Sequence, residues 1–257
     1  MRPVVEVTAV SKEFSGADGS PPYLAVASIS FKARPGEVVC IVGQTGCGKS
    51  TIVNMMLGLE PPTSGSILVD GVSPSDDFMG LKRRVAAVFQ TDRLLPWRTV
   101  VDNAALGLEA AGIGKDERQN VALHWLERVG LARWAGRYLH ELSGGMRQRV
   151  ALVRAFVLDP VVLILDEAFG HLDEVTAQKL RKQCLGLIAE TNKVAVVVTH
   201  NISEALEIGN RVLVLGRPAQ VLHDYDLSDQ REHKDWEKRH SSLRSEIFSL
   251  IEGKSDS

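Results

Sequence analysis

One glycine-rich segment constrains the fold of this chain more than any other feature of the sequence. Residues 43–50 read GQTGCGKS and fit the pattern G-x-x-x-x-G-K-[ST] at every fixed position. A continuous apolar run at 38–42 precedes them, and a helical stretch at 49–59 follows. A strand, a glycine turn and a helix in this order place backbone N–H groups and the positive end of a helix around one anion. We therefore predict a phosphate-binding loop.

The side chains of this loop have predicted roles. Lys49 would reach the β- and γ-phosphates of a nucleotide, and the Ser50 hydroxyl would coordinate Mg²⁺. The predicted nucleotide-binding residues here are Gly43, Gln44, Thr45, Gly46, Cys47, Gly48, Lys49, Ser50 and Thr51. The alternative is a glycine turn that fits the pattern by chance, but the flanking strand and helix favour the phosphate site.

Strands and helices alternate along most of the chain. Apolar runs predict strands at 4–10, 29–33, 38–42, 85–89, 161–165, 194–199 and 211–215. Residues 91–159 instead carry helical periodicity, which predicts helices at 100–111, 116–129 and 144–158. Alternating strands and helices require crossover connections, and hence a mainly parallel sheet. We predict an α/β core with a helical subdomain inserted at about 91–159.

A second apolar strand ends in two carboxylates. Residues 161–165 read VVLIL, and Asp166 and Glu167 follow. Successive side chains of a strand point to opposite faces, so the two carboxylates cannot share one role. We assign Asp166 to the Mg²⁺ shell and Glu167 to the water that attacks the phosphate. The alternative is a pair of surface carboxylates that end an ordinary strand.

A serine and two glycines begin the best-marked helix of the middle block. Ser143 can cap this helix, while Gly144 and Gly145 leave its first N–H groups open to an anion. Alone, the pattern is also that of a simple capped helix. The heptapeptide LSGGMRQ at 142–148 nevertheless resembles the signature motif of ABC ATPases, and its place shortly before Asp166 is also the family's. In that family the signature completes the ATP site of a second copy of the chain, which implies a dimer that binds ATP and Mg²⁺.

Further positions match the ABC ATPases in order. By this resemblance Gln90 is the Q-loop glutamine, which touches Mg²⁺ or the water, and Asp173 belongs to the D-loop near the nucleotide. His200 corresponds to the switch histidine that contacts the γ-phosphate, although a lone histidine after a strand is more often structural. Phe14 stands where the family stacks an aromatic ring on adenine, with Tyr23 as a rival and a core aromatic as the alternative.

The chain departs from the family pattern at several places. Met146 stands where glutamine is frequent, and Ala168 where proline is frequent. Gly170 and His171 precede the Leu-Asp of the D-loop as a variant of a commoner Ala-Leu-Asp ending, and Asn201 replaces a common aspartate. None of these departures removes a predicted phosphate or metal ligand, but they leave the rate of hydrolysis open.

The resemblance covers roughly residues 4–222 and implies a specific architecture. We expect a P-loop NTPase core of the ABC type with a mainly parallel sheet, an N-terminal antiparallel β subdomain and the inserted helical subdomain. The ABC ATPase domain would span 1–225. The tail at 226–257 is charged and then weakly amphipathic. A regulatory appendage, a dimer contact and a solvated end are all open for it, and the charge run favours the solvated end.

The segment after the Q-loop glutamine narrows the family. Its Leu-Pro-Trp resembles the nitrate, sulfonate and taurine importers, in which two ATPase copies serve two transmembrane permease copies and, indirectly, an external solute-binding protein. Leu94, Leu95 and Trp97 would form an apolar ledge suited to a short permease helix, with Tyr138 and Leu139 lining the same groove. The alternative packs Trp97 inside the helical subdomain.

Composition limits the other classes of function. The net charge is −2, whereas a nucleic-acid binder usually carries a basic surplus. We therefore expect no nucleic-acid partner. No run reaches the roughly 18 apolar residues of a membrane span, and the N-terminus lacks the organisation of a signal peptide. We expect a cytoplasmic protein, peripheral on the inner face of the cell membrane.

Three alternative functions stay open. They are the ATPase of an ABC exporter or lipid transporter, a non-transport ABC ATPase acting on nucleic acid, and an ATP-binding module that no longer hydrolyses. The Leu-Pro-Trp segment argues against the first, and the charge against the second. Lys49, Asp166, Glu167 and His200 are all in place, which argues against the third.

Overall fold

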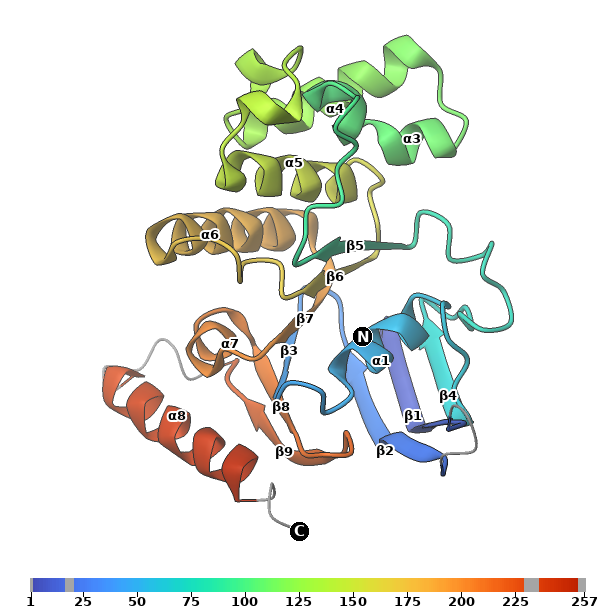
Figure 1. The fold of residues 1–257 in the computed structure, drawn as a ribbon, viewed down its shortest axis with the longest axis vertical. Coiled ribbons are helices and arrows are strands. Elements are labelled where there is room, and N and C mark those ends of the chain that lie inside the picture. The colour runs from blue at the N-terminus through green and yellow to red at the C-terminus, as the bar shows by residue number, and fades with distance from the viewer. Residues whose placement is uncertain (1, 17–20, 229–235, 254–257) are drawn as a thin grey trace.

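The computed structural model describes residues 2–16, 21–228 and 236–253 (Figure 1). Its strands are β1 (Val5–Phe14), β2 (Tyr23–Ala33), β3 (Val38–Gly43), β4 (Ser64–Val69), β5 (Val85–Phe89), β6 (Val162–Asp166), β7 (Val194–Thr199), β8 (Arg211–Leu215) and β9 (Val221–Asp226). Its helices are α1 (Lys49–Met56), α2 (Val100–Ala104), α3 (Leu106–Ala110), α4 (Lys115–Arg128), α5 (Gly144–Phe156), α6 (Glu174–Thr191), α7 (Ile202–Ile208) and α8 (Trp236–Glu252), with 3-10 helices at Ala132–Trp134 and Leu139–Glu141. Within these ranges, no helix is long and apolar enough to cross a membrane.

The strands form two sheets. The central sheet has the order β5-β6-β7-β3-β8-β9, with its first five strands parallel and β9 antiparallel to β8. The second sheet, β2-β1-β4, is antiparallel. β3 and β7 are buried along their whole length, as expected of apolar strands covered on both faces. The predicted α/β class, with a mainly parallel core and an N-terminal antiparallel β subdomain, is confirmed.

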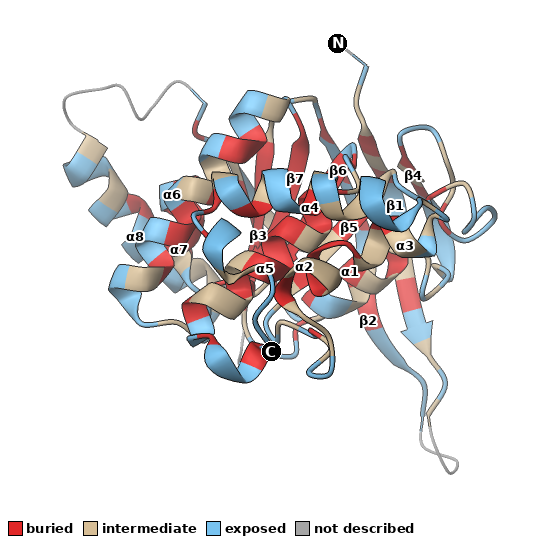
Figure 2. Ribbon diagram, turned by 90° about the horizontal axis from the view of Figure 1, so that it is seen from above, coloured by how far each residue is buried: buried red, intermediate tan, exposed pale blue. Residues whose placement is uncertain are grey.

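Alternate residues of β3 belong to two different hydrophobic clusters. Val38, Cys40 and Val42 pack on the side of α5, α6, α7 and α8, whereas Val39 and Ile41 pack with β1, β2 and α1. The pleat of the strand explains this split, because successive side chains point to opposite faces. Figure 2 shows the buried residues concentrated along the central strands. The glycine loop that follows β3 therefore starts from a strand held firmly on both faces.

The helical subdomain stands above the central sheet in Figure 1 and consists of α2 to α5 with the two 3-10 helices. The single helix predicted for 100–111 is divided at Ala105, where ψ is −4° instead of the usual value near −42°. The next predicted helix corresponds closely to α4. The last ends at Phe156, two residues early, and Asp159 then takes a φ of +50° before a proline, a position that disfavours the right-handed helical region.

The C-terminal segment folds back onto the core instead of extending into solvent. α8 packs against α7 and β8, and Leu243 and Ile247 on one face of it are buried. The solvated interpretation of the tail is therefore wrong for this helix, since Leu243 and Ile247 are buried one turn apart and Trp236, Leu250 and Ile251 also pack against the core. Part of the charged run that suggested it, 229–235, lies outside the described residues.

The packing of α8 can be tested by truncating its buried face. Ile247→Ala should lower the free energy of unfolding by about 2–4 kcal/mol, because it deletes fully buried methyl groups and leaves a cavity. Phe248→Ala, at the next position and 53% exposed, is the matched control and should cost less than about 1 kcal/mol. Urea denaturation of the full chain measures both. Equal losses for the two variants would contradict the packing of α8.

Candidate functional site

The glycine loop joins β3 to α1 in the conformation that the sequence predicts. Gly46 and Gly48 have φ values of +76° and +112°, in the region that favours glycine. A Cβ on Gly48 would lie 2.4 Å from the carbonyl oxygen of Ala25, so no side chain fits there. By contrast, a Cβ on Gly46 would meet nothing within 4 Å, which leaves that side of the loop open to a ligand.

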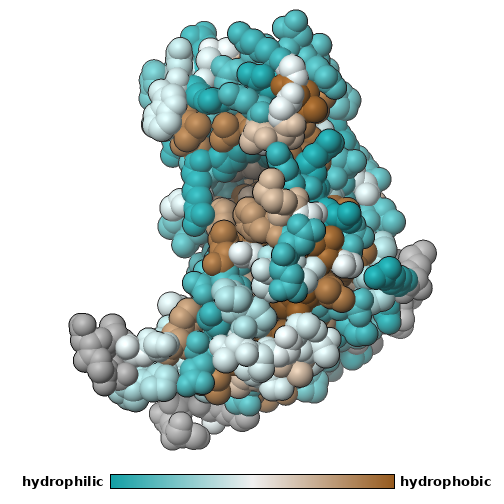
Figure 3. All heavy atoms as spheres, turned by 90° about the vertical axis from the view of Figure 1, so that its right-hand side faces the viewer, coloured by the Kyte–Doolittle hydropathy of each residue, from teal (hydrophilic) through white to brown (hydrophobic). Residues whose placement is uncertain are grey.

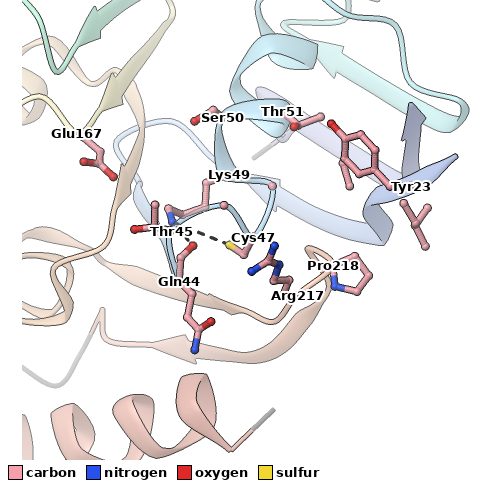
Figure 4. Close-up of a pocket in the computed structure, with 14 residues that line it drawn as sticks. Tyr23, Gln44, Thr45, Cys47, Lys49, Ser50, Thr51, Glu167, Arg217 and Pro218 are labelled. Atoms are coloured by element: carbon pink, nitrogen blue, oxygen red, sulfur yellow. Dashed lines mark hydrogen bonds between the residues drawn. The ribbon is translucent and has the colours of Figure 1, made fainter. Parts of the chain in front are cut away.

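A cavity of about 720 Å³ lies over this loop (Figure 4). Its lining consists of Tyr23, Leu24, Ala25, residues 44–51, Glu167, Arg217 and Pro218. Eight of the nine predicted loop residues are in this lining, and Gly43 lies directly before it. Sequence reasoning missed Arg217 and Pro218, which come from the turn between β8 and β9 and carried no local signal.

Lys49 is buried within the loop. Its ammonium donates to the carbonyl oxygens of Gly43 at 2.7 Å and Gln44 at 2.8 Å. The Gln44 side chain points away from Lys49 in Figure 4 and donates to the carbonyl oxygen of Ile251 at 3.2 Å. The last turn of α8 is thus attached to the loop. A cation in a glycine loop at the start of a helix suits a polyanion such as a di- or triphosphate.

Two carboxylates lie at the end of β6, in different environments. Asp166 is partly buried, and burial, followed by the neighbouring charge of Glu167, raises the pKa of its carboxyl group. Glu167 has a φ of +50°, which is uncommon for a residue with a side chain. This backbone turns its carboxylate into the cavity (Figure 4), where Oε1 lies 3.0 Å from Nδ1 of His200. The structure thus brings together two of the predicted catalytic residues from separate strands.

Gln90 follows β5 and is exposed, and it does not line the cavity over the loop. A buried residue of α5, Gln148, lies behind it. The Gln148 amide donates to the carbonyl oxygens of Phe89 at 3.3 Å and Ala168 at 2.6 Å. One side chain therefore fixes the residue before Gln90 and the residue after Glu167. Sequence reasoning missed this bridge, because it depends on how α5 packs on the sheet.

The start of α5 has the predicted capped form. The Ser143 hydroxyl accepts a hydrogen bond from the Met146 N–H at 3.3 Å, and Gly144 is exposed. Gly145 is buried instead, since a Cβ there would lie 2.6 Å from Cγ2 of Thr176 on α6. Asp173 caps α6 by accepting from the Thr176 N–H at 3.0 Å, and hydrogen bonds from Thr176 lower the pKa of this carboxyl group.

None of the four residues Ser143, Gly144, Gly145 and Asp173, all within the described chain, lines the cavity over the loop. The chain therefore has two separate helix starts of the kind that suits an anion, one at Lys49 and one at Gly144. Only the first of them lines the cavity over the loop.

The two candidate aromatic rings for adenine lie against each other. Phe14 and Tyr23 stack with ring centroids 5.4 Å apart, and the ammonium of Lys12 lies 4.9 Å from the Phe14 centroid. Tyr23 is 59% exposed and lines the cavity, whereas Phe14 is partly buried behind it. The geometry favours Tyr23, the rival, as the ring that a base would meet, and assigns Phe14 to its support.

A second cavity, of about 730 Å³, lies between the helical subdomain and the core. Leu59, Phe78, Met79 and Phe89 are among its lining residues, and Figure 3 shows hydrophobic side chains gathered on this side of the molecule. Arg93 lies over the Phe89 ring, 3.6 Å from its centroid. We call this cavity the apolar groove.

The predicted apolar ledge differs from this groove. Leu94 is 8% exposed and Leu139 is also buried, so neither offers a free apolar face. Trp97 is 71% exposed, which excludes packing inside the helical subdomain, but it does not line the groove.

The backbone of Leu95 is held by the buried side chain of Asn103, which accepts from the Leu95 N–H at 2.7 Å and donates to the Leu95 carbonyl oxygen at 3.0 Å. Tyr138 is exposed beside Thr99. The groove is built largely from residues elsewhere in the sequence.

Comparison with known proteins decides the family. A family model described as "ABC transporter" matches residues 26–170, more than half of the chain, including the glycine loop, the start of α5 and both carboxylates after β6. The chain belongs to the ABC transporter family. Members of this family bind ATP and hydrolyse it in transport.

Curated relatives place this ABC ATPase among importer subunits. It is 36% identical over 253 residues to a nitrate import ATP-binding protein (NrtD) of Synechococcus elongatus, covering 94% of this chain and 89% of that protein. It is 43% identical over 200 residues to a taurine import ATP-binding protein (TauB) of Rhizobium johnstonii, covering 77% and 75%. These matches agree with the resemblance drawn from Leu-Pro-Trp.

Solved structures share the fold. A dimeric ATP-binding cassette in a post-hydrolysis state, with ADP and phosphate bound, superposes with a TM-score of 0.77 at 31% identity, covering 87% of this ABC ATPase and 98% of that chain. A protein from Clostridium perfringens that is part of an ABC transporter complex gives a TM-score of 0.79 at 26% identity, covering 98% of this chain and 100% of that chain. The described core of the chain thus has the ABC ATPase fold.

Proposed function

We propose that this ABC ATPase powers the import of a small anion or organic solute, of the nitrate or taurine kind, through a separate permease. Two copies would work together on the cytoplasmic face of the cell membrane, and an external solute-binding protein would deliver the solute. The observation that carries the proposal is the likeness to nitrate and taurine import ATP-binding proteins over most of the chain. The solute would never touch this subunit, so its residues do not select it.

The residues of the ATP site support in-line hydrolysis. The Tyr23 ring would stack on adenine, and Lys49 with the P-loop N–H groups would hold the β- and γ-phosphates. Glu167 would take a proton from the attacking water as the new bond forms to the γ-phosphorus and the bond to the bridging β–γ oxygen breaks. His200, 3.0 Å from Glu167, would hold the γ-phosphate in line. ADP and phosphate would leave.

The site also suits Mg²⁺. The hydroxyl of Ser50, the carboxylate of Asp166 and the amide oxygen of Gln90 are hard oxygen donors, and Mg²⁺ is usually bound by one or two carboxylates together with phosphate oxygens. The raised pKa of Asp166, which burial and the charge of Glu167 cause, marks a place where a cation relieves electrostatic cost. When bound, the ion would neutralise charge that develops on the β- and γ-phosphates.

Two copies would complete each other's sites. Ser143 and Gly144 offer N–H groups away from the P-loop of their own chain, and the post-hydrolysis neighbour is a dimer. We therefore assign Ser143, Gly144 and Asp173 to the partner's nucleotide. Gly145 would act by letting α5 approach Thr176 of α6, rather than by contacting phosphate.

The apolar groove would receive a short cytoplasmic helix of the permease. It is lined by apolar side chains from both the core and the helical subdomain, so a change in their relative position would reach a helix seated between them. Phe78 and Met79 are 56% and 70% exposed, as expected of residues that await a partner. Trp97, outside the groove, would contribute at its periphery.

The groove provides the experiment that tests the proposed function. Met79→Asp should abolish co-purification of the permease and solute uptake into proteoliposomes, while basal ATP hydrolysis by the isolated chain stays unchanged, because a charge is costly in a desolvated apolar contact. Phe248→Asp, on the exposed face of α8, is the matched control and should leave uptake intact. Uptake of nitrate and of taurine is measured separately. Normal uptake by Met79→Asp, or uptake of neither solute by the wild-type complex, would contradict the proposal.

A further inference from the structure

A buried carboxylate lies behind His200, in the first turn of α7. Glu204 is 5% exposed. Its Oε2 accepts a hydrogen bond from the hydroxyl of Thr199 at 3.4 Å, whereas its buried Oε1 has no hydrogen-bond partner among the described residues. Burying an ionisable group is costly unless neighbouring groups compensate the charge. The contacts around Glu204 show which part of the chain this buried carboxylate holds in place.

Those contacts enclose the backbone of His200. The oxygen of the Thr199 hydroxyl accepts from the N–H of Asn201 at 3.0 Å, and Oδ1 of Asn201 accepts from the N–H of Glu204 at 3.1 Å. With the bond between Thr199 and Glu204, they form a closed ring of hydrogen bonds that begins on one side of His200 and ends on the other. The ring leaves the imidazole itself exposed, with Nδ1 beside Glu167.

Charged groups from two helices face this ring. The buried guanidinium of Arg181 on α6 contacts Glu174 at 2.6 Å, and it pairs with Glu207 on α7 at 2.9 Å outside hydrogen-bond geometry. Burial raises the pKa of Glu204 to about 7, against the opposing effects of Arg181, Thr199 and His200. The carboxylate is thus held near the balance between its ionised and protonated forms at neutral pH.

Glu204, His200 and Glu167 also share a cavity of about 110 Å³ with Gly170 and Leu172 of the D-loop. Neither Thr199 nor Glu204 lines the ATP cavity over the P-loop. We propose that Thr199 and Glu204 are positioning residues for ATP hydrolysis, and that the hydrogen bond between them fixes the loop that aims His200 at Glu167 and the γ-phosphate. The inference rests on the proposed role of His200 in hydrolysis.

The hydroxyl of Thr199 gives the sharpest test. Thr199→Val keeps the shape of the side chain and removes the hydroxyl, whereas Thr199→Ser keeps the hydroxyl. Thr199→Val should lower kcat by about tenfold or more with KM for ATP changed less than about twofold, because small errors in the placement of a reacting group act on turnover and not on binding. Thr199→Ser should stay within about twofold of wild type. Equal kcat for the two variants, or a loss confined to KM, would overturn the proposal.

The role of Glu204 is tested by removing its charge alone, or its charge together with its hydrogen-bond acceptor. Glu204→Gln keeps an acceptor for the Thr199 hydroxyl, and Glu204→Met removes it at similar size, so turnover above neutral pH should follow the order wild type, Gln, Met. As the pH falls through about 7, Glu204 gains a proton, becomes a donor and competes with the Asn201 N–H for the Thr199 oxygen. The ratio of wild-type to Glu204→Gln turnover should therefore fall on acidification. A ratio independent of pH would contradict the assignment.

A readout independent of turnover separates this inference from the proposed function. The imidazole NMR signal of His200, assigned by its loss in His200→Ala, should shift in Thr199→Val and not in Thr199→Ser. Thermal unfolding identifies any variant that has lost its fold, in which case Glu204→Met replaces Thr199→Val in the comparison. A wild-type chain without ATPase activity would contradict the proposed function alone. An unshifted His200 signal in Thr199→Val would contradict the inference alone.

Discussion

Glu167→Gln should hydrolyse ATP about 10²–10⁴ times more slowly than the wild-type chain while binding ATP at least as tightly, because a general base contributes a factor of this size. The backbone at Glu167 has a φ of +50°, and Oε1 lies 3.0 Å from His200. A strained backbone that turns a carboxylate toward a phosphate site is best explained by a catalytic role of that carboxylate. Glutamine keeps the size and the hydrogen bonds of the side chain but cannot take the proton.

The same substitution should trap the ATP-bound dimer. With binding intact and hydrolysis blocked, ATP would hold two chains together, so the variant should elute as a dimer with ATP and as a monomer with ADP. Phosphate release and size-exclusion chromatography measure the two effects. Glu190→Gln, an exposed carboxylate at the end of α6, is the control and should behave as wild type. Rapid phosphate release by Glu167→Gln would rule out Glu167 as the base.

The parts of the site that the sequence predicted are those formed by a few consecutive residues. The P-loop needs glycine where φ is positive, and Gly48 has no room for a Cβ. The backbone geometry of the loop therefore requires the glycines of the sequence pattern. Apolar strands buried on both faces were equally predictable from the sequence, because β3 and β7 have no polar residue until they end. Local physics determines such elements, and tertiary packing only assembles them.

Residues whose role depends on packing were not predictable. Gln148 bridges two carbonyl groups at the ends of different strands, and nothing in its neighbourhood in the sequence indicates this. The choice between Phe14 and Tyr23 depends on which ring of a stacked pair faces outward. The apolar groove includes Met79, which comes from a loop with no regular pattern. The packing of α8 depends on buried residues of a segment whose sequence is only weakly amphipathic. Each of these features requires knowing which elements lie side by side.

The second large effect concerns which chain supplies each half of an ATP site. Lys49→Ala removes the cation from the P-loop, and Gly144→Glu places a negative charge where the signature should meet phosphate. Each homodimer should lose at least about 99% of its hydrolysis, since a preorganised charge contact with the reacting phosphate contributes factors of 10² or more. Gly144→Glu should not disturb folding, because a Cβ at Gly144 meets only Arg147, at 4.0 Å. Gly114→Glu, at the exposed start of α4, controls for the added charge.

A dimer of one Lys49→Ala chain and one Gly144→Glu chain should recover hydrolysis, to at least about ten times either homodimer. If sites form between chains, the intact P-loop of the second chain meets the intact signature of the first, and one site works. If each site lay within one chain, both would be dead. The reverse arrangement, a wild-type chain paired with a chain carrying both substitutions, should be inactive in the first case and half-active in the second. Phosphate release from differently tagged pairs, isolated with the permease, measures both arrangements. The two geometries predict opposite results. Activity in the second pair with none in the first would therefore overturn the shared site.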